Sequence, residues 1–165
     1  MSARARLQGA FREAMASVAA PVSVVTSMTG GLPHGATVSA FASLSMDPPM
    51  VLVSLDRRSG LLAVIRESGS FGVNVLGATQ SSLALAFART GGTAKFDGVS
   101  WQVDSGLPRL PGAPGWVACD VARLVEGGDH VVVLGDVVVA ETTAGEPLTY
   151  HGRAFGTHAI LEAAS

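Results

Sequence analysis

Small polar side chains lie inside segments that otherwise have the composition of a buried sheet. Residues 34–59, HGATVSAFASLSMDPPMVLVSLDRRS, carry five serines and one threonine around two short apolar runs. Thr37 and Ser39 are two positions apart and would share one face of a strand, and Asn74 interrupts the apolar run GVNVL. Such groups could bind the polar edge of a flat, apolar ligand, a description that a flavin ring fits. They could equally be structural, with the serines filling a tight barrel and Asn74 completing a local turn.

Two cations could bind a phosphate at the end of the same stretch. Arg57 and Ser59 stand where a strand turns into a helix, and free backbone N–H groups beside a guanidinium favour phosphate binding. Lys95, the one lysine of the chain, follows the Gly91-Gly92 break, so a loop could bring its ammonium group to the same phosphate. A solvated arginine and a loop lysine are also ordinary surface features.

Several classes of site are excluded by the motifs that the sequence lacks. It contains no GxGxxG cradle, no phosphate-binding GxxxxGK[ST] loop and no GxSxG nucleophile elbow. The histidines at positions 34, 130, 151 and 158 lack the close helical spacing of zinc enzymes. We therefore expect no metal site.

Length and composition narrow the class of protein further. A chain of 165 residues suits one domain over residues 1–165, and a net charge of -2 gives no indication of nucleic-acid binding. Apolar residues make up 48% and charged residues 15%, a balance that predicts a homo-oligomer with a covered apolar face. We find no membrane span or secretory signal, and the single cysteine fits a reducing, cytoplasmic setting.

Hydrophobic periodicity predicts strands with a few peripheral helices. An amphipathic opening helix carries Leu7, Phe11, Met15 and Val18 and stops at Pro21, and two more helices are expected over 59–69 and 79–87. Strands are expected over 22–28, 36–41, 50–55, 70–76, 116–125 and 130–143. The first two would form a hairpin with a longer loop, and residues 104–115 would be a Pro/Gly-rich loop. Mostly antiparallel strands of this kind favour a closed or nearly closed barrel.

Six segments, in order, carry a resemblance to a known family. They are PHGATVSAFASLSMDPPMVLVSLDRRS, SFGVNVL, LALAFA followed by KFDGVSW, GLPRLPGA, GGDHVVVLGDV and PLTYHGRAF, which span nearly the whole chain from Val22 to Phe155. The chain resembles the flavin reductase family with an FMN-binding split barrel, the reductase component of two-component flavin monooxygenases. The resemblance implies a mainly β fold with peripheral α-helices, an antiparallel split β-barrel.

The resemblance also implies a site, position by position. Residues expected at the ring edge are Thr37, Val38 and Ser39. Residues expected near the ribityl chain and phosphate are Ser43, Asp56, Arg57 and Ser59. Residues expected on the pyrimidine side of the ring are Asn74, Val75 and Leu76, and those closing the pocket are Phe87, Ala88, Lys95 and Phe96. His130 would meet the nicotinamide as the catalytic residue, and Tyr150 would shape its entrance.

The implied activity is that of an NAD(P)H:flavin oxidoreductase. NADH or NADPH would deliver hydride from C4 to N5 of FMN or FAD, and the reduced flavin would pass to a partner monooxygenase. The sequence leaves open which flavin and which nicotinamide are used, and whether the flavin stays bound or turns over. A non-catalytic flavin-binding barrel, an oxidase of the pyridoxamine-phosphate type and an interaction module without ligand stay as alternatives.

Overall fold

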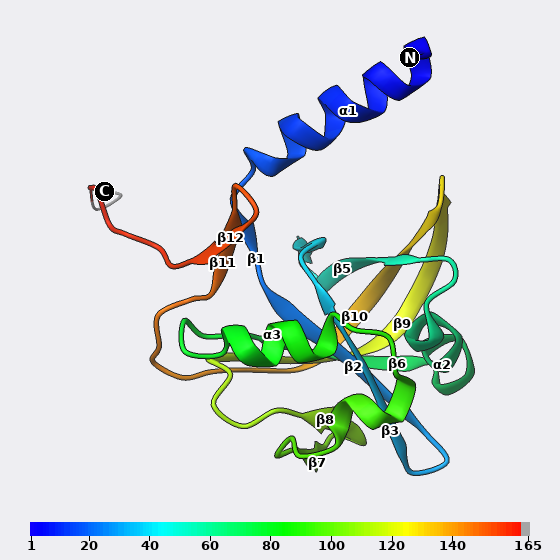
Figure 1. The fold of residues 1–165 in the computed structure, drawn as a ribbon. Helices are drawn as coiled ribbons and strands as arrows, with labels where there is room; N and C mark the ends of the chain where they lie inside the picture. Colours follow the sequence, from blue (N-terminus) through cyan, green and yellow to red (C-terminus); the bar gives the residue numbers. More distant parts are fainter. Residues whose placement is uncertain (163–165) are drawn as a thin grey trace.

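The main element of the fold is an antiparallel sheet that curls on itself. The structure, a computed structural model, describes residues 1–162. Seven strands lie in the order β3-β2-β6-β9-β10-β5-β4. Their bounds are β2 Ser23–Thr29, β3 Leu32–Val38, β4 Phe41–Met46, β5 Pro49–Asp56, β6 Ser70–Val75, β9 Gly115–Gly127 and β10 His130–Thr142. The two edge strands, β3 and β4, are joined by Ser39 and Ala40 alone, so the edges approach without pairing (Figure 1). This arrangement is a split barrel and confirms the predicted fold class.

Two small sheets flank the barrel, and the hydrophobic periodicity of the sequence predicts neither of them. β1 (Ala20–Pro21), β11 (Thr149–His151) and β12 (Ala154–Gly156) form a three-stranded sheet, while β7 (Gln102–Asp104) pairs with β8 (Leu107–Arg109). Each of these strands has two or three residues, too few for a hydrophobic period to show. The predicted loop over 104–115 therefore contains a strand.

The hairpin of β2 and β3 is tighter than predicted. Pairing continues to Thr29 and Leu32, so Gly30 and Gly31 alone form the turn, with φ of 57° and 75°. Two-residue turns of this type need positive φ at both central positions, which glycine adopts without steric cost. β3 consequently starts at Leu32 instead of residue 36, and it ends at Val38 because the chain bends there into β4.

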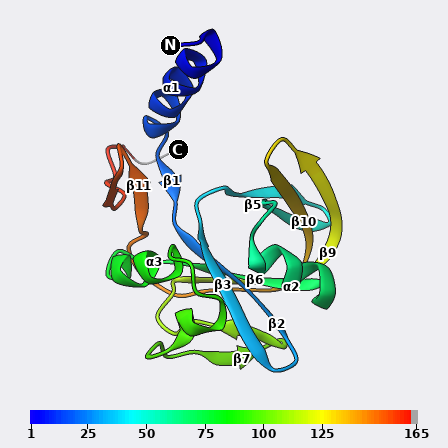
Figure 2. The same ribbon diagram turned by 45° about the vertical axis from the view of Figure 1, so that its right-hand side comes forward.

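Three α-helices and one 3-10 helix lie around the barrel. They are α1 (Ala3–Ala16), α2 (Gly60–Ser68), α3 (Ser81–Phe87) and η1 (Gly92–Phe96). α2 has the predicted limits: Ser59 is its N-cap, and Gly69 ends it in a left-handed conformation with its N–H bonded to the Ile65 carbonyl. α1 has no buried residue and projects away from the barrel (Figures 1 and 2). Within the described part of the chain, no helix is long and apolar enough to cross a membrane.

The apolar core has two main parts, one inside the barrel and one under α3. One cluster fills the barrel and includes Val25, Val53, Ile65, Phe71 and Val133. The second lies under α3 and includes Leu76, Phe87, Phe96, Leu110 and Leu148. Because residues 23–27 of β2 are all buried, this strand is covered on both faces and holds the two clusters together.

Candidate functional site

Three hollows lie along β3 and its neighbours. The basic hollow, of about 270 Å³, is lined by His34, Gly35, Ala36, Arg58, Ser59, Gly60, Leu61, Arg89, Thr90, Gly91, Gly92 and Lys95. The central hollow, of about 340 Å³, is lined by Val22, Thr37, Ser39, Ala84, Leu85, Ala88, Tyr150, Arg153 and Phe155. The outer hollow, of about 540 Å³, is lined by Arg12, Met15, Ala16, Val18, Ala20, Ser39, Ala40, Tyr150 and Arg153. The basic and central hollows use consecutive residues of β3, and the central and outer hollows share three residues.

The central hollow combines small residues with hydroxyl groups. The hydroxyl of Thr37 donates to the carbonyl of Ala84 at 2.5 Å, which ties β3 to α3. Ser39 lies just past the end of β3, and its hydroxyl has no hydrogen-bond partner within residues 1–162. The Tyr150 ring forms the far wall and contacts Phe155 edge to face, with ring centroids 5.5 Å apart. The hollow thus offers a flat apolar wall with a free hydroxyl at its rim.

The basic hollow carries two arginines, a lysine and a histidine, and no carboxylate lines it. It adjoins the start of α2, whose first backbone N–H groups have no acceptor within the helix. Arg89 has no hydrogen bond or ion pair among the described residues. These features fit an anionic group such as a phosphate.

Lys95 links two walls of the basic hollow. Its ammonium donates to the carbonyl of Gly35 at 3.1 Å and to the carbonyl of Phe87 at 3.2 Å. Partial burial lowers the pKa of this ammonium. The rings of Phe87 and Phe96 meet edge to face beneath it, with centroids 4.9 Å apart. Both rings are buried, so they support the hollow from below and do not line it.

Arg57 and Arg58 differ from the expectation, because Arg57 is turned away from the basic hollow. The Arg57 Nε donates to the carbonyl of Gly128 at 2.9 Å, and its Nη2 lies 2.5 Å from a carboxylate oxygen of Glu126. Arg58 lines the hollow instead. It forms two side-chain hydrogen bonds to Asp56, at 3.0 and 3.1 Å, which together with a backbone bond lower the pKa of this carboxyl to about 2. Asp56 is therefore engaged by Arg58.

Asn74 is completely buried, and its amide is used within the protein. Its Nδ2 donates to the carbonyl of Val24 at 3.2 Å, with a weaker contact to Pro108 at 3.5 Å. Its Oδ1 accepts from the N–H of Leu110 at 2.7 Å. These contacts join β2, β6 and the loop after β8, and they favour the structural interpretation of this side chain.

His130 lies at the tip of the β9–β10 hairpin and lines none of the three hollows. Its Nδ1 is 2.8 Å from Asp129, and its backbone pairs with Asp56. Ser43 is exposed on β4 and also lies outside the hollows. The structure therefore separates both residues from Thr37 and the other site residues on β3.

Five residues of the expected site lie together along the hollows. They are Thr37, Ser39, Ser59, Ala88 and Lys95, and Tyr150 completes them at the boundary of the central and outer hollows. The buried side chains of Val38 and Leu76, and the half-buried Val75, form walls behind them.

The basic lining residues that no sequence pattern predicted are Arg12, His34, Arg58, Arg89 and Arg153. Arg89 had a signal in the sequence, because it precedes the same Gly-Gly break that pointed to Lys95. Arg153 lies in the turn of a strand pair too short to be predicted.

Known proteins are similar to this chain in sequence and in architecture. The profile of the family described as flavin reductase like domain matches residues 15–159. The reductase component of 4-nitrophenol 4-monooxygenase/4-nitrocatechol 2-monooxygenase from Rhodococcus opacus is 41% identical over 146 residues, 88% of this chain and 78% of that protein. The FMN reductase (NADH) SmoA of Agrobacterium fabrum is 38% identical over 147 residues, 88% of this chain and 83% of that protein.

A solved structure agrees with these relatives. The NADH:FAD oxidoreductase of Streptomyces globisporus, in complex with NAD and FAD fragments, superposes with a TM-score of 0.88 at 31% identity, and the match covers 99% of this chain and 98% of that one. The family predicted from the ordered motifs is thereby confirmed: the chain belongs to the flavin reductase like domain family.

Proposed function

We propose that this chain is an NAD(P)H:flavin oxidoreductase that reduces FMN or FAD and supplies the reduced flavin to a partner monooxygenase. The observation that carries the proposal is the continuity of the basic and central hollows along β3. One end is positively charged, and the other is a wall of small, aromatic and hydroxyl-bearing residues. A phosphorylated ligand with a flat ring fits this sequence of surfaces.

The residues present fit a flavin. Arg58, Arg89 and Lys95 would hold the phosphate together with the N-terminal N–H groups of α2. Thr37, Ser39 and Ala88 would lie along the ring. When bound, the flavin supplies the hydride acceptor at N5.

The protein's own contribution to the reaction is alignment. The backbone of β3 is fixed between β2 and α3, which places Thr37, and Ser39 just after the strand, along the ring edge. The Tyr150 ring limits the approach of the nicotinamide to one side of the central hollow. Holding two reactants in this way lowers the barrier by fixing their relative position before reaction.

We also propose a cytoplasmic homodimer, in which a second copy covers α1. Leu7 and Phe11 on α1 are 71% and 61% exposed, so an apolar helix face lacks cover within one copy. Light scattering coupled to size exclusion would give the mass of a dimer. Phe11→Glu should shift the measured mass toward that of a monomer, because a charge in an apolar interface is costly. Gly9→Glu introduces the same charge on the same helix but outside the apolar face, so this control should keep the mass of the dimer.

His130 remains a proposed contact for the nicotinamide. It lies outside the three hollows, at the start of β10, so this contact requires a nicotinamide that reaches beyond the central hollow. His130→Ala should then raise the KM for the nicotinamide or slow flavin reduction about tenfold. Stopped-flow reduction at a wild-type rate, with wild-type saturation, would remove His130 from the site.

The activity itself is tested by steady-state oxidation of NADH and NADPH with added FMN, FAD or riboflavin. Oxidation that depends on added flavin supports the reductase. Flavin binding without oxidation would favour the passive flavin-binding barrel, and absence of both would favour an interaction module.

A further inference from the structure

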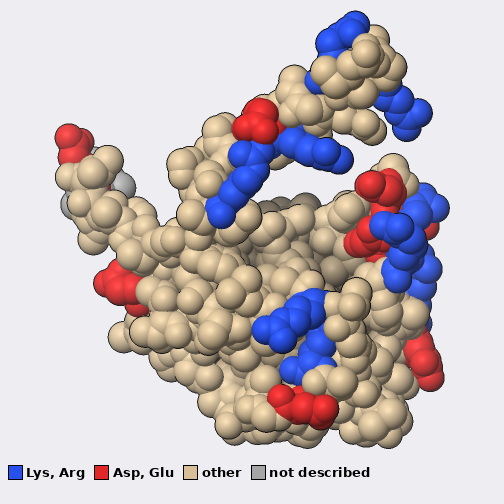
Figure 3. Space-filling model, in the orientation of Figure 1, with Lys and Arg blue, Asp and Glu red and all other residues tan. Residues whose placement is uncertain are grey.

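The outer hollow is the largest of the three and has a mixed wall. Its apolar side is formed by Met15, Ala16 and Val18 at the end of α1 and by the strand that follows. Figure 3 shows the space beneath α1, bordered mainly by uncharged residues, with basic side chains on the helix above it. Two guanidinium groups, from Arg12 and Arg153, belong to the lining.

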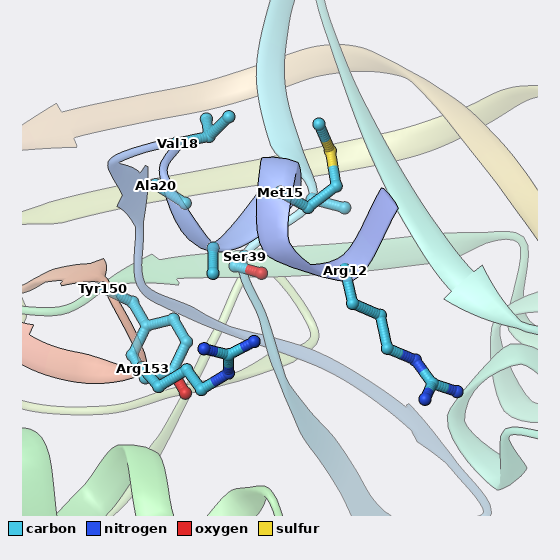
Figure 4. A pocket seen from close by; sticks show the side chains of 9 residues that line it. Arg12, Met15, Val18, Ala20, Ser39, Tyr150 and Arg153 are labelled. Atoms are coloured by element: carbon cyan, nitrogen blue, oxygen red, sulfur yellow. The ribbon is translucent and has the colours of Figure 1, made fainter. Parts of the chain in front are cut away.

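Arg153 has an unusual backbone conformation. It follows Gly152 in the two-residue turn between β11 and β12, where the φ angles are 57° for Gly152 and 62° for Arg153. Glycine, asparagine and aspartate favour such positions, and other residues meet a steric cost there. The two-residue turn between β11 and β12 itself requires this conformation, and the turn places Arg153 at the edge of the hollow. Figure 4 shows that side chain next to the Tyr150 ring and Ser39.

The charge of the outer hollow is positive. Arg153 forms one ion pair, with its Nη2 2.5 Å from a carboxylate oxygen of Glu13 on α1. Arg12 has no ion-pair partner within residues 1–162, and no acidic residue lines the hollow. Guanidinium groups in an apolar hollow favour an anion, and their planar donors match phosphate oxygens in pairs.

The position of the hollow indicates which anion. Ser39, Tyr150 and Arg153 line both the outer and the central hollow, so an occupant of one would touch an occupant of the other. Resting on the proposed function, in which the flavin ring occupies the central hollow, the outer occupant is the hydride donor. The chain has no glycine-rich cradle for a dinucleotide, so side chains must meet the charge of its phosphates.

We propose that Arg153, together with Arg12, binds the phosphate groups of the nicotinamide dinucleotide. The Glu13 carboxylate holds Arg153 toward α1 in the absence of the co-substrate and is displaced by phosphate. The dinucleotide thereby lies under α1, with its nicotinamide directed past Tyr150 toward the flavin.

The central variant for the test is Arg153→Asn. Asparagine tolerates positive φ, so the turn is kept and thermal stability should be equal or higher. We expect the KM for NADH to rise about tenfold or more, the effect of losing a charge-assisted hydrogen bond. The effect on kcat should be smaller than the effect on KM. Arg153 also lines the central hollow, so the affinity for FMN is titrated separately and each assay is run at saturating flavin. With N-benzyl-dihydronicotinamide, a hydride donor that has no phosphate, the variant and wild type should reduce flavin equally fast.

Three further variants separate binding from a structural role. Glu13→Gln breaks the same ion pair but frees Arg153, so the KM for NADH should be unchanged or lower. Arg123→Gln, at an exposed position on β9, removes the same charge far from the hollow and should leave the KM unchanged. Arg12→Gln should raise the KM in the same direction as Arg153→Asn.

The alternative outcomes are distinct. If Glu13→Gln raises the KM as much as Arg153→Asn does, the arginine acts by holding α1, and the inference is wrong. Equal losses with NADH and with the phosphate-free donor, or an unchanged KM for NADH in an active protein, overturn it as well. A wild-type protein that oxidises no NADH with any flavin would overturn the proposed function first, and this inference with it.

Discussion

Replacing Asn74 with leucine tests whether this buried amide supports the fold or the ligand. The change keeps a branched side chain of similar size and removes every polar atom. It leaves the N–H of Leu110 without its 2.7 Å acceptor in a buried position, which costs about 1–3 kcal/mol. The lost bond to the carbonyl of Val24 adds about 1 kcal/mol. Burial of the new apolar atoms returns about 1 kcal/mol, so the net loss of unfolding free energy is about 1–3 kcal/mol.

Urea unfolding of the apoprotein measures this loss. A destabilisation of this size lowers the urea midpoint by roughly 1 M, given an m value of about 1–3 kcal/mol per molar urea. Thr26→Val is the matched comparison: it removes one hydroxyl donor to the Pro108 carbonyl, at 2.7 Å, and should cost about 1 kcal/mol. Titration of the folded Asn74→Leu protein with FMN should give an affinity close to wild type.

The opposite result would refute the structural interpretation. An unchanged or higher urea midpoint, together with a large loss of FMN affinity, would show that the Asn74 amide contacts the flavin. The three hydrogen bonds of the apoprotein would then have to rearrange when the ligand binds.

Three further predictions follow from other parts of the structure. Arg89→Gln should weaken FMN binding about ten- to a hundredfold and leave riboflavin binding unchanged. Arg57→Gln should have little effect on either flavin, because Arg57 is paired with the β9–β10 hairpin. Isothermal titration measures both affinities, and a larger loss of FMN affinity in Arg57→Gln than in Arg89→Gln would show that Arg57 binds the phosphate. Burial raises the pKa of the Cys119 thiol to about 12, so iodoacetamide should alkylate it at pH 8 in urea and not in the folded protein; rapid alkylation without urea would contradict this burial. A Cβ added at Gly135 would lie 2.5 Å from a Phe71 ring carbon and 2.9 Å from Cys119 Cβ, so Gly135→Ala should lower the thermal midpoint by several degrees. Gly127→Ala should leave the midpoint unchanged, because its new Cβ meets nothing closer than 4.0 Å. Equal midpoints for the two variants would show that the barrel adjusts at this bulge.

Local chemistry was sufficient for most of the longer elements and for the family, whereas the edge strand β4 and the short strands of the two small sheets were not predicted. Ser59 and Gly69 marked both ends of α2; the Ser59 hydroxyl makes no capping hydrogen bond, whereas Gly69 ends the helix in a left-handed conformation within one turn of the chain. The long strands β9 and β10 were predicted within a few residues, since their apolar runs exceed the length at which the pattern becomes clear. The order of the polar motifs was enough to identify the family and, through it, the segment at the end of β3 that carries Thr37 and, just after the strand, Ser39.

The direction of individual side chains depended on segments distant in sequence. Neighbouring arginines such as Arg57 and Arg58 have the same local signal, and the carboxylate of Glu126 on a hairpin decides which of them faces the basic hollow. The amide of Asn74 is taken by Val24 and Leu110, which a single strand pattern does not reveal. The arrival of Arg153 beside Ser39 likewise depends on two strands of three residues each. Sequence determined where the longer helices and most of the longer strands form, because those preferences act over a few residues. Tertiary structure decided the short strands and which polar groups remain free for a ligand, because hydrogen-bond partners and charges are brought together only when the sheet curls.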